Sequence, residues 1–92
     1  MNDYTRERRR EELLVHFNRR FADDLKDVRA RCSYVDVSAD MNEDARGRLT
    51  ATVTLTCAVG EKVTSSRALY EYRQRSAQVS QEGWHCYNDW RD

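Results

Sequence analysis

The groups of this chain best suited to bind a ligand are its arginines, of which there are 14 against only two lysines. A guanidinium group makes paired, planar hydrogen bonds to phosphate and carboxylate groups and also stacks on nucleic-acid bases. The densest cluster is the stretch TRERRREE, residues 5–12, which contains four arginines and three glutamates. Two interpretations are open: this stretch is a solvated helix face laced with ion pairs, or it is a contact surface for an anionic partner.

Two groups of arginines are candidates for partner binding. The first lies in the N-terminal segment, where the positive end of a helix dipole disfavours each cation by about 0.3–1 kcal/mol, so helix stability does not explain it. The second accompanies Tyr70 and Tyr72, and basic residues interleaved with aromatic ones are typical of surfaces that stack single-stranded nucleic acid. Tyrosines on a strand are more often packing residues, and we favour that interpretation. The predicted partner-binding residues are Arg6, Arg9, Arg10, Arg19, Arg20, Arg67, Arg73 and Arg75.

The cysteines and histidines do not predict a reactive site. Cys32, Cys57 and Cys86 are widely spaced, with no CxxC pair to hold zinc. Adjacent residues of a strand face opposite sides, so His85 and Cys86 are poor joint ligands. We therefore interpret the cysteines as reduced, buried small hydrophobes and His16 as an exposed side chain. We expect no metal, no cofactor, no small-molecule substrate and no catalytic activity.

Length and composition predict a single domain over residues 1–92. The chain has 16 basic and 16 acidic residues, and 35% of its residues are charged. A protein that binds DNA through its phosphates alone is normally more basic than this. The arginine-rich start is followed by only a short apolar run, and no segment approaches the roughly 20 apolar residues of a membrane span. We expect a cytoplasmic protein that does not enter a membrane.

Apolar residues at spacings of three and four predict one long amphipathic helix over about residues 5–31. The apolar positions are Leu14, Phe17, Phe21, Leu25, Val28 and Cys32. Asn2, Asp3 or Thr5 can cap the start of this helix. Its solvent face is expected to carry Arg8, Arg9, Glu12, His16, Arg19, Asp23 and Lys26.

Three later segments alternate apolar and polar residues, the pattern of half-buried strands: residues 33–39, 49–59 and 62–72. Gly60 and Glu61 suit a two-residue type II′ turn, which places Val59 opposite Lys62. Residues 65–80 also fit a helical period, but we favour the strand, and residues 83–90 are expected to close the core as a short strand or turn. The predicted fold class is α+β, with one long N-terminal amphipathic helix packed on a small antiparallel sheet of three to four strands.

Over its whole length the chain resembles the phage-encoded type I-F anti-CRISPR proteins. The stretches that carry the resemblance are MNDYTRERRREELLVHFNRRF, residues 1–21, and SRALYEYRQRSAQVSQEGWHCYNDW, residues 66–90. These inhibitors share a role but no common fold, so the resemblance transfers no site residue. It implies a stoichiometric, non-enzymatic inhibitor that docks on the Cascade-like Csy surveillance complex and stops the guide RNA from pairing with target DNA.

The partners implied by the resemblance are the backbone subunits of that complex and its guide RNA, with the large subunit as a further candidate. Such a complex exposes both phosphates and basic grooves made for DNA, so its ligand should carry cations and anions side by side. The chain has alternating blocks of net charge: +2 for residues 1–31, −3 for 32–47, +3 for 48–79 and −2 for 80–92. Two other classes stay open, a small arginine-rich nucleic-acid-binding or regulatory protein and a phage component that self-associates through a sheet edge.

Overall fold

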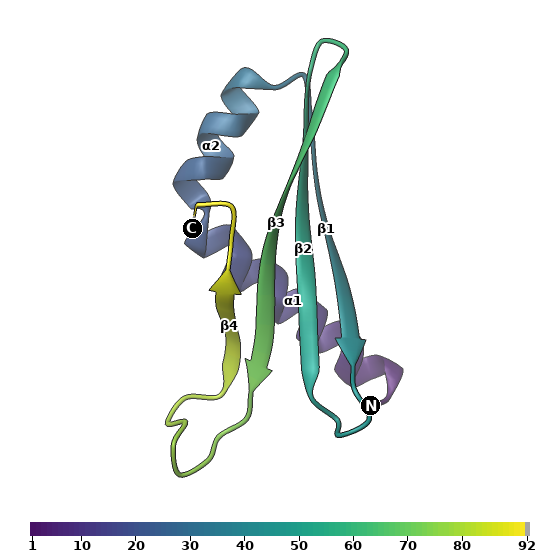
Figure 1. The fold of residues 1–92 in the computed structure, drawn as a ribbon, viewed down its shortest axis with the longest axis vertical. Helices are drawn as coiled ribbons and strands as arrows, with labels where there is room; N and C mark the ends of the chain where they lie inside the picture. Colours follow the sequence, from purple (N-terminus) through teal and green to yellow (C-terminus); the bar gives the residue numbers. More distant parts are fainter. Residues whose placement is uncertain (92) are drawn as a thin grey trace.

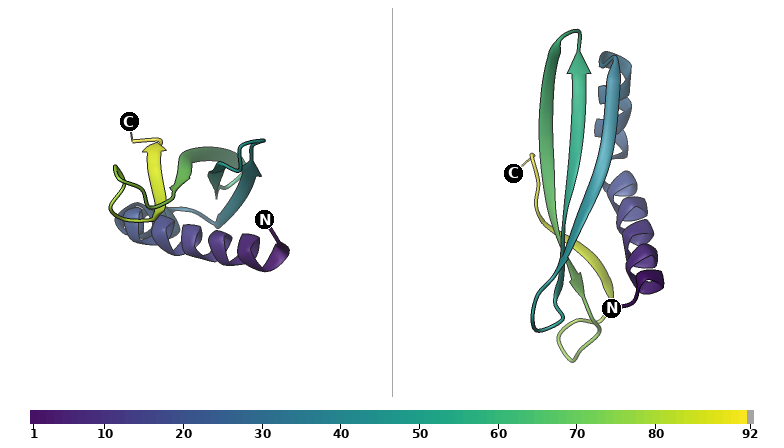
Figure 2. Two further views of the ribbon diagram at one scale, coloured as in Figure 1. Left: turned by 90° about the horizontal axis from the view of Figure 1, so that it is seen from below. Right: turned by 90° about the vertical axis from the view of Figure 1, so that its right-hand side faces the viewer.

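The computed structural model describes residues 1–91 of the 92-residue chain as two helices packed on one sheet. The helices come first and the strands follow: α1 (Asp3–Arg20), α2 (Ala22–Arg31), β1 (Tyr34–Glu43), β2 (Leu49–Val59), β3 (Lys62–Arg73) and β4 (Gly83–Asn88). The strands form one antiparallel sheet in the order β1-β2-β3-β4 (Figure 1). Both helices lie on the same face of this sheet (Figure 2). The predicted α+β class and antiparallel sheet are therefore confirmed, with four strands.

The prediction of one long helix is wrong, because the helix breaks at Phe21. The backbone of Phe21 has φ −111° and ψ 25°, outside helical geometry. No proline or glycine marks the break. The ring of Phe21 is fully buried and stacks on Trp90 at 4.3 Å between centroids. A straight helix cannot follow a twisted sheet, so the break lets α2 turn along the sheet while the apolar stripe stays continuous. At the other end, Asn2 caps α1 by accepting the Thr5 N–H at 2.8 Å, as predicted.

The long hairpin of β2 and β3 follows the sequence prediction closely. Gly60 has a positive φ of 61° and Glu61 does not have a positive φ, which fits the type II′ turn. Val59 pairs with Lys62. The strand interpretation holds through Arg73, while residues 74–82 form neither strand nor helix. Strand β4 pairs with β3 only between Leu69 and Arg73, so residues 62–68 of β3 have a neighbouring strand on one side only.

The core lies between the helices and one face of the sheet. Successive strand residues face opposite sides, and the register aligns one apolar row from each strand beneath the helices. The buried cluster consists of Leu13, Phe17, Phe21, Leu25, Ala39, Leu49, Ala51, Val53, Leu55, Ala68, Tyr70 and Trp84. The other face of the sheet carries the threonines of β2, and no element of residues 1–91 covers it. We call this second face the open face.

The predicted solvent face of α1 is wrong at two positions, Arg9 and His16, which are partly buried. Rings from the sheet reach this side of the helix. The Arg9 guanidinium lies 4.4 Å from the centroid of the Tyr72 ring, and the His16 ring meets Tyr70 edge-on at 5.5 Å. Burial, aided by the charge of Arg20, lowers the pKa of His16 below its usual 6.5, so this imidazole is neutral at physiological pH.

The prediction of three reduced, buried cysteines is also wrong, because Cys32 and Cys57 form a disulfide bond. Cys86 is a free thiol. The bond joins the residue that follows α2 to β2, across a sequence separation of 25. Pairing of β1 with β2 brings the two cysteines together, since Cys57 lies opposite Val35, three residues after Cys32. Disulfide bonds persist mainly in oxidising compartments, so the cysteines do not support the expectation of a reduced protein.

Removal of the disulfide bond is expected to lower the free energy of unfolding by about 3 kcal/mol, because a bond across 25 residues restricts the unfolded chain. Thermal unfolding with and without dithiothreitol checks this. The reductant should lower the midpoint of the wild type by on the order of 15 °C and leave the Cys32→Ser/Cys57→Ser double variant unchanged. The matched control Cys86→Ser should respond like the wild type. If dithiothreitol does not change the thermal unfolding midpoint of the wild type, the Cys32–Cys57 bond is not formed.

Candidate functional site

The fold divides the arginines into two equal groups. Within residues 1–91, seven of the 14 take part in ion pairs: Arg8, Arg9, Arg20, Arg31, Arg48, Arg73 and Arg91. Of the eight predicted partner-binding residues, three are therefore engaged inside the protein and five are not. The five are Arg6, Arg10, Arg19, Arg67 and Arg75, and all five are exposed. Whether any of the eight contacts a partner stays a prediction.

Arg9 links α1 to the sheet. Its guanidinium donates to Glu12 Oε2 at 3.0 Å and covers the Tyr72 ring. Its carbonyl oxygen accepts a hydrogen bond from Trp84 Nε1 at 2.8 Å. Because only 17% of the Arg9 side chain is exposed, most of its surface is used within the fold.

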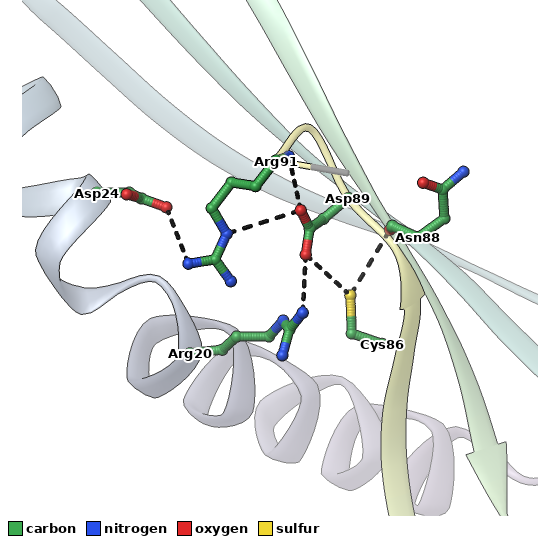
Figure 3. Close-up of polar contacts among 6 residues, drawn as sticks. All are labelled: Arg20, Asp24, Cys86, Asn88, Asp89 and Arg91. Carbon is green, nitrogen blue, oxygen red and sulfur yellow. Dashed lines mark hydrogen bonds and ion pairs between the residues drawn. The ribbon is translucent and has the colours of Figure 1, made fainter.

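Arg20 holds the C-terminal segment against the end of α1 (Figure 3). Its Nη2 donates to Asp89 Oδ2 at 2.9 Å, and the side chain of Asp89 is 0% exposed. The backbone N–H of Arg91 donates to Asp89 Oδ1 at 2.7 Å, and the Arg91 guanidinium reaches Asp24 at 3.6 Å. Burial alone would raise the pKa of Asp89, but the hydrogen bonds from Arg20 and Arg91 outweigh it and hold that pKa below 3.8. Asp89 is therefore a permanent anion at neutral pH.

The favoured interpretation of Tyr70 and Tyr72 as packing residues is confirmed, and the arginines of β3 do not share their face. Odd-numbered β3 residues, including Arg67 and Arg73, face the open face, while Tyr70 and Tyr72 face the helices. The Tyr70 ring is fully buried, and burial raises the pKa of its hydroxyl. Arg73 donates to Glu71 Oε1 at 2.9 Å. These tyrosines therefore present no free ring for a nucleic-acid base on the arginine side of the sheet.

The five candidates that make no ion pair within residues 1–91 fall into two sets according to the element that carries them. Arg6, Arg10 and Arg19 lie on α1, and we call them the helix arginines. Arg67 on the open face and Arg75 in the following loop are the sheet arginines. Arg67 and the helix arginines belong to opposite layers of the molecule, because α1 covers the face of the sheet away from Arg67 (Figure 2).

Two further arginines, Arg29 and Arg46, also lack an ion pair within the described part of the chain. Arg46 is not among the predicted partner-binding residues. Asp44 could have indicated a structured turn at this position. An aspartate side chain that accepts hydrogen bonds from the backbone N–H groups of the next few residues organises a turn. Its Oδ1 accepts from the N–H groups of Arg46 at 2.9 Å and Arg48 at 2.8 Å, and these bonds, led by that of Arg48, lower the pKa of Asp44.

Metal-ligand geometry and membrane-spanning length were searched for over residues 1–91. No group of three or more His, Cys, Asp and Glu side chains in this range could hold a metal ion. Neither of its helices is long and apolar enough to cross a bilayer. The Cys86 thiol lies on the helix side of β4, where it donates to the Asn88 carbonyl at 3.6 Å, while His85 is exposed. Exposed guanidinium groups can hydrogen-bond to anions.

Comparison with protein-family models, curated protein sequences and solved structures finds no match for this chain. Its function must therefore be argued from its own residues and from the whole-chain resemblance described for the sequence.

The neighbours Arg19 and Arg20 give a matched test of the division between free and structural arginines. Arg20→Gln should lower the free energy of unfolding by about 2 kcal/mol, because it removes a charged hydrogen bond from the buried Asp89 carboxylate. Arg19→Gln should stay within about 0.5 kcal/mol of the wild type. Urea unfolding of both variants provides the measurement. Equal losses would mean that the Arg20–Asp89 pair does not stabilise the fold.

The same pair predicts a dependence on pH. A carboxyl group whose pKa is lowered by folding adds stability above its unfolded value, near 3.8, and loses that contribution as the pH falls through its folded pKa. Asp89→Asn should therefore cost about 2 kcal/mol at neutral pH, and its difference from the wild type should shrink below pH 3.8. The control Asp36→Asn, at an exposed position on β1, should cost little at either pH. A deficit that is the same at both pH values would contradict the assignment.

Proposed function

We propose that this chain is a non-enzymatic phage inhibitor that binds the type I-F CRISPR surveillance complex in the cytoplasm of an infected bacterium. It docks on the backbone subunits and the guide RNA and thereby blocks hybridisation of the guide with target DNA. The proposal carries forward the whole-chain resemblance to type I-F anti-CRISPR proteins. A binding role also fits a chain whose exposed residues include many arginines.

The observation that supports this proposal most is a set of exposed arginines with no role inside the fold. Arg6 and Arg10 lie four residues apart on α1, so their like charges repel and disfavour the helix by roughly 0.2–0.5 kcal/mol. Arg8 lies 3.7 Å from Glu12, whereas neither Arg6 nor Arg10 makes an ion pair within residues 1–91. Since folding gains nothing from Arg6 and Arg10, an outside anionic surface is the simplest reason for their presence.

The open face favours a partner of mixed charge over bare nucleic acid. Asp36 and Asp40 lie on this face along β1, and both are exposed. Arg67 lies on the same face two strands away, opposite Thr54. The acidic strand would repel a nucleic-acid backbone but would suit a basic groove of a protein subunit. A surveillance complex offers both basic grooves and RNA phosphates.

Charge reversal of the helix arginines and of the sheet arginines tests the proposal. The variants are Arg6→Glu/Arg10→Glu/Arg19→Glu and Arg67→Glu/Arg75→Glu, with Arg29→Glu as a control that belongs to neither set. The measurement is competition between each protein and labelled target DNA for the purified surveillance complex. At least one set should weaken inhibition by about tenfold or more, equivalent to about 1.4 kcal/mol. Circular dichroism and the thermal midpoint should stay unchanged, because these residues make no ion pairs within residues 1–91.

Three outcomes would contradict the proposal. If neither set changes inhibition, the arginines are not the contact surface. If the wild type leaves the complex fully active but binds free DNA or RNA with steep salt dependence, the chain is a nucleic-acid-binding protein. If it does not inhibit and sediments as an oligomer, self-association through a sheet edge becomes the better explanation.

A further inference from the structure

A cavity of about 470 Å³ lined by arginines lies at one end of the molecule. The N-terminus of α1, the loop between β1 and β2, and the start of the loop after β3 meet there (Figure 1). Its lining includes three arginines, Arg9, Arg46 and Arg48. Arg46 and Arg48 belong to neither the helix arginines nor the sheet arginines, and the sequence did not single them out. The volume lies in the range of pockets that bind small ligands.

The loop that carries two of these arginines is held in place by Asp44. Besides the backbone bonds described above, Asp44 Oδ2 accepts from Arg48 Nε at 3.1 Å. Gly47 has a φ of 79°, a conformation that a residue with a side chain rarely adopts. The Gly47 N–H donates to the Asp44 carbonyl at 3.0 Å. The backbone is therefore fixed, while the Arg46 guanidinium and the terminal nitrogens of Arg48 remain available to a ligand.

Arginine side chains outnumber carboxylates in the lining of the cavity. Arg9, Arg46 and Arg48 line it, and Glu43 is its one lining carboxylate within residues 1–91. Two of these arginines have ion-pair partners, since Arg9 lies 3.0 Å from Glu12 and Arg48 lies 3.1 Å from Asp44. Thr5, in the first turn of α1, also lines the cavity, so the positive end of the helix dipole faces the same space. An anion that enters meets cations from the helix and from the loop.

We propose that this cavity binds a phosphodiester group of single-stranded RNA. A planar carboxylate is satisfied by one guanidinium fork, whereas guanidiniums that converge from a helix and a loop suit the non-bridging oxygens of a tetrahedral phosphate. Thr5 and Gln74 also line the cavity, and their side chains are of the kinds that hydrogen-bond a ribose 2′-hydroxyl, the group by which a protein distinguishes RNA from DNA. The inference rests on the proposed function and deepens it by assigning Arg46 and Arg48 to the guide RNA.

Titration of the isolated, isotope-labelled protein tests this inference without the surveillance complex. The probe is a short oligouridylate, followed by amide nuclear magnetic resonance. The amide signals of Thr5, Gly47 and Leu49, which line the cavity, should shift. Arg46→Gln should weaken binding about tenfold, as expected for the loss of one charge-assisted contact, and should fold normally because Arg46 is exposed. Arg29→Gln, an unpaired arginine on α2, should change the affinity less than about twofold.

Comparison ligands make the result decisive. The matched deoxyribonucleotide should bind more weakly than the oligouridylate, and oligoglutamate and inorganic phosphate should shift the same signals only at much higher concentration. Unchanged affinity in Arg46→Gln would overturn the inference, as would oligoglutamate or inorganic phosphate that binds as well as the RNA. Because the complex is absent from this measurement, its failure is distinguishable from failure of the inhibitor proposal, which is decided by the competition assay.

Discussion

The packing of one apolar helix stripe against a one-sided sheet is the interaction on which the rest of this structure depends. Neither layer is stable alone, because a short helix is marginal in water and a sheet with one apolar face must cover it. Phe17 and Phe21 are buried at the centre of this contact, where both rings lie against Trp90. That contact turns α2 along the sheet and brings the C-terminal segment back to the helices. The disulfide bond and the Arg20–Asp89 pair both join segments placed by this packing.

The same packing decides which cations serve the fold and which remain for other uses. Arg9 and Arg20 lie on the flank of α1 that meets β4 and the C-terminal segment, so their groups bond inward. Arg6, Arg10 and Arg19 share the helix but project away from those contacts. Arginines of the same helix thus serve different purposes, and their position around the helix axis decides whether they bond inward. An arginine-rich segment cannot be assigned to binding as a whole.

The sheet could be predicted from the sequence because its signals are local. Alternation along β2 and the glycine at position 60 define both strands and the turn between them. The separation of Arg67 from Tyr70 onto opposite faces of the sheet follows from the same alternation and could have been predicted. The break at Phe21, the disulfide bond and the pairing of Arg20 with Asp89 could not be found this way. Each depends on a partner far along the chain, 69 residues away for Arg20, and leaves no local pattern.

The disulfide bond has a consequence for strand alignment. A slip of one residue between β1 and β2 would turn the strand over and carry the Cys57 sulfur to the threonine side, away from Cys32. The disulfide bond can therefore form only in molecules whose two strands have the correct register, and it then holds that register covalently. In an oxidised preparation, thiols beyond the one that Cys86 contributes to each chain would report the fraction of chains in which Cys32 and Cys57 are not joined.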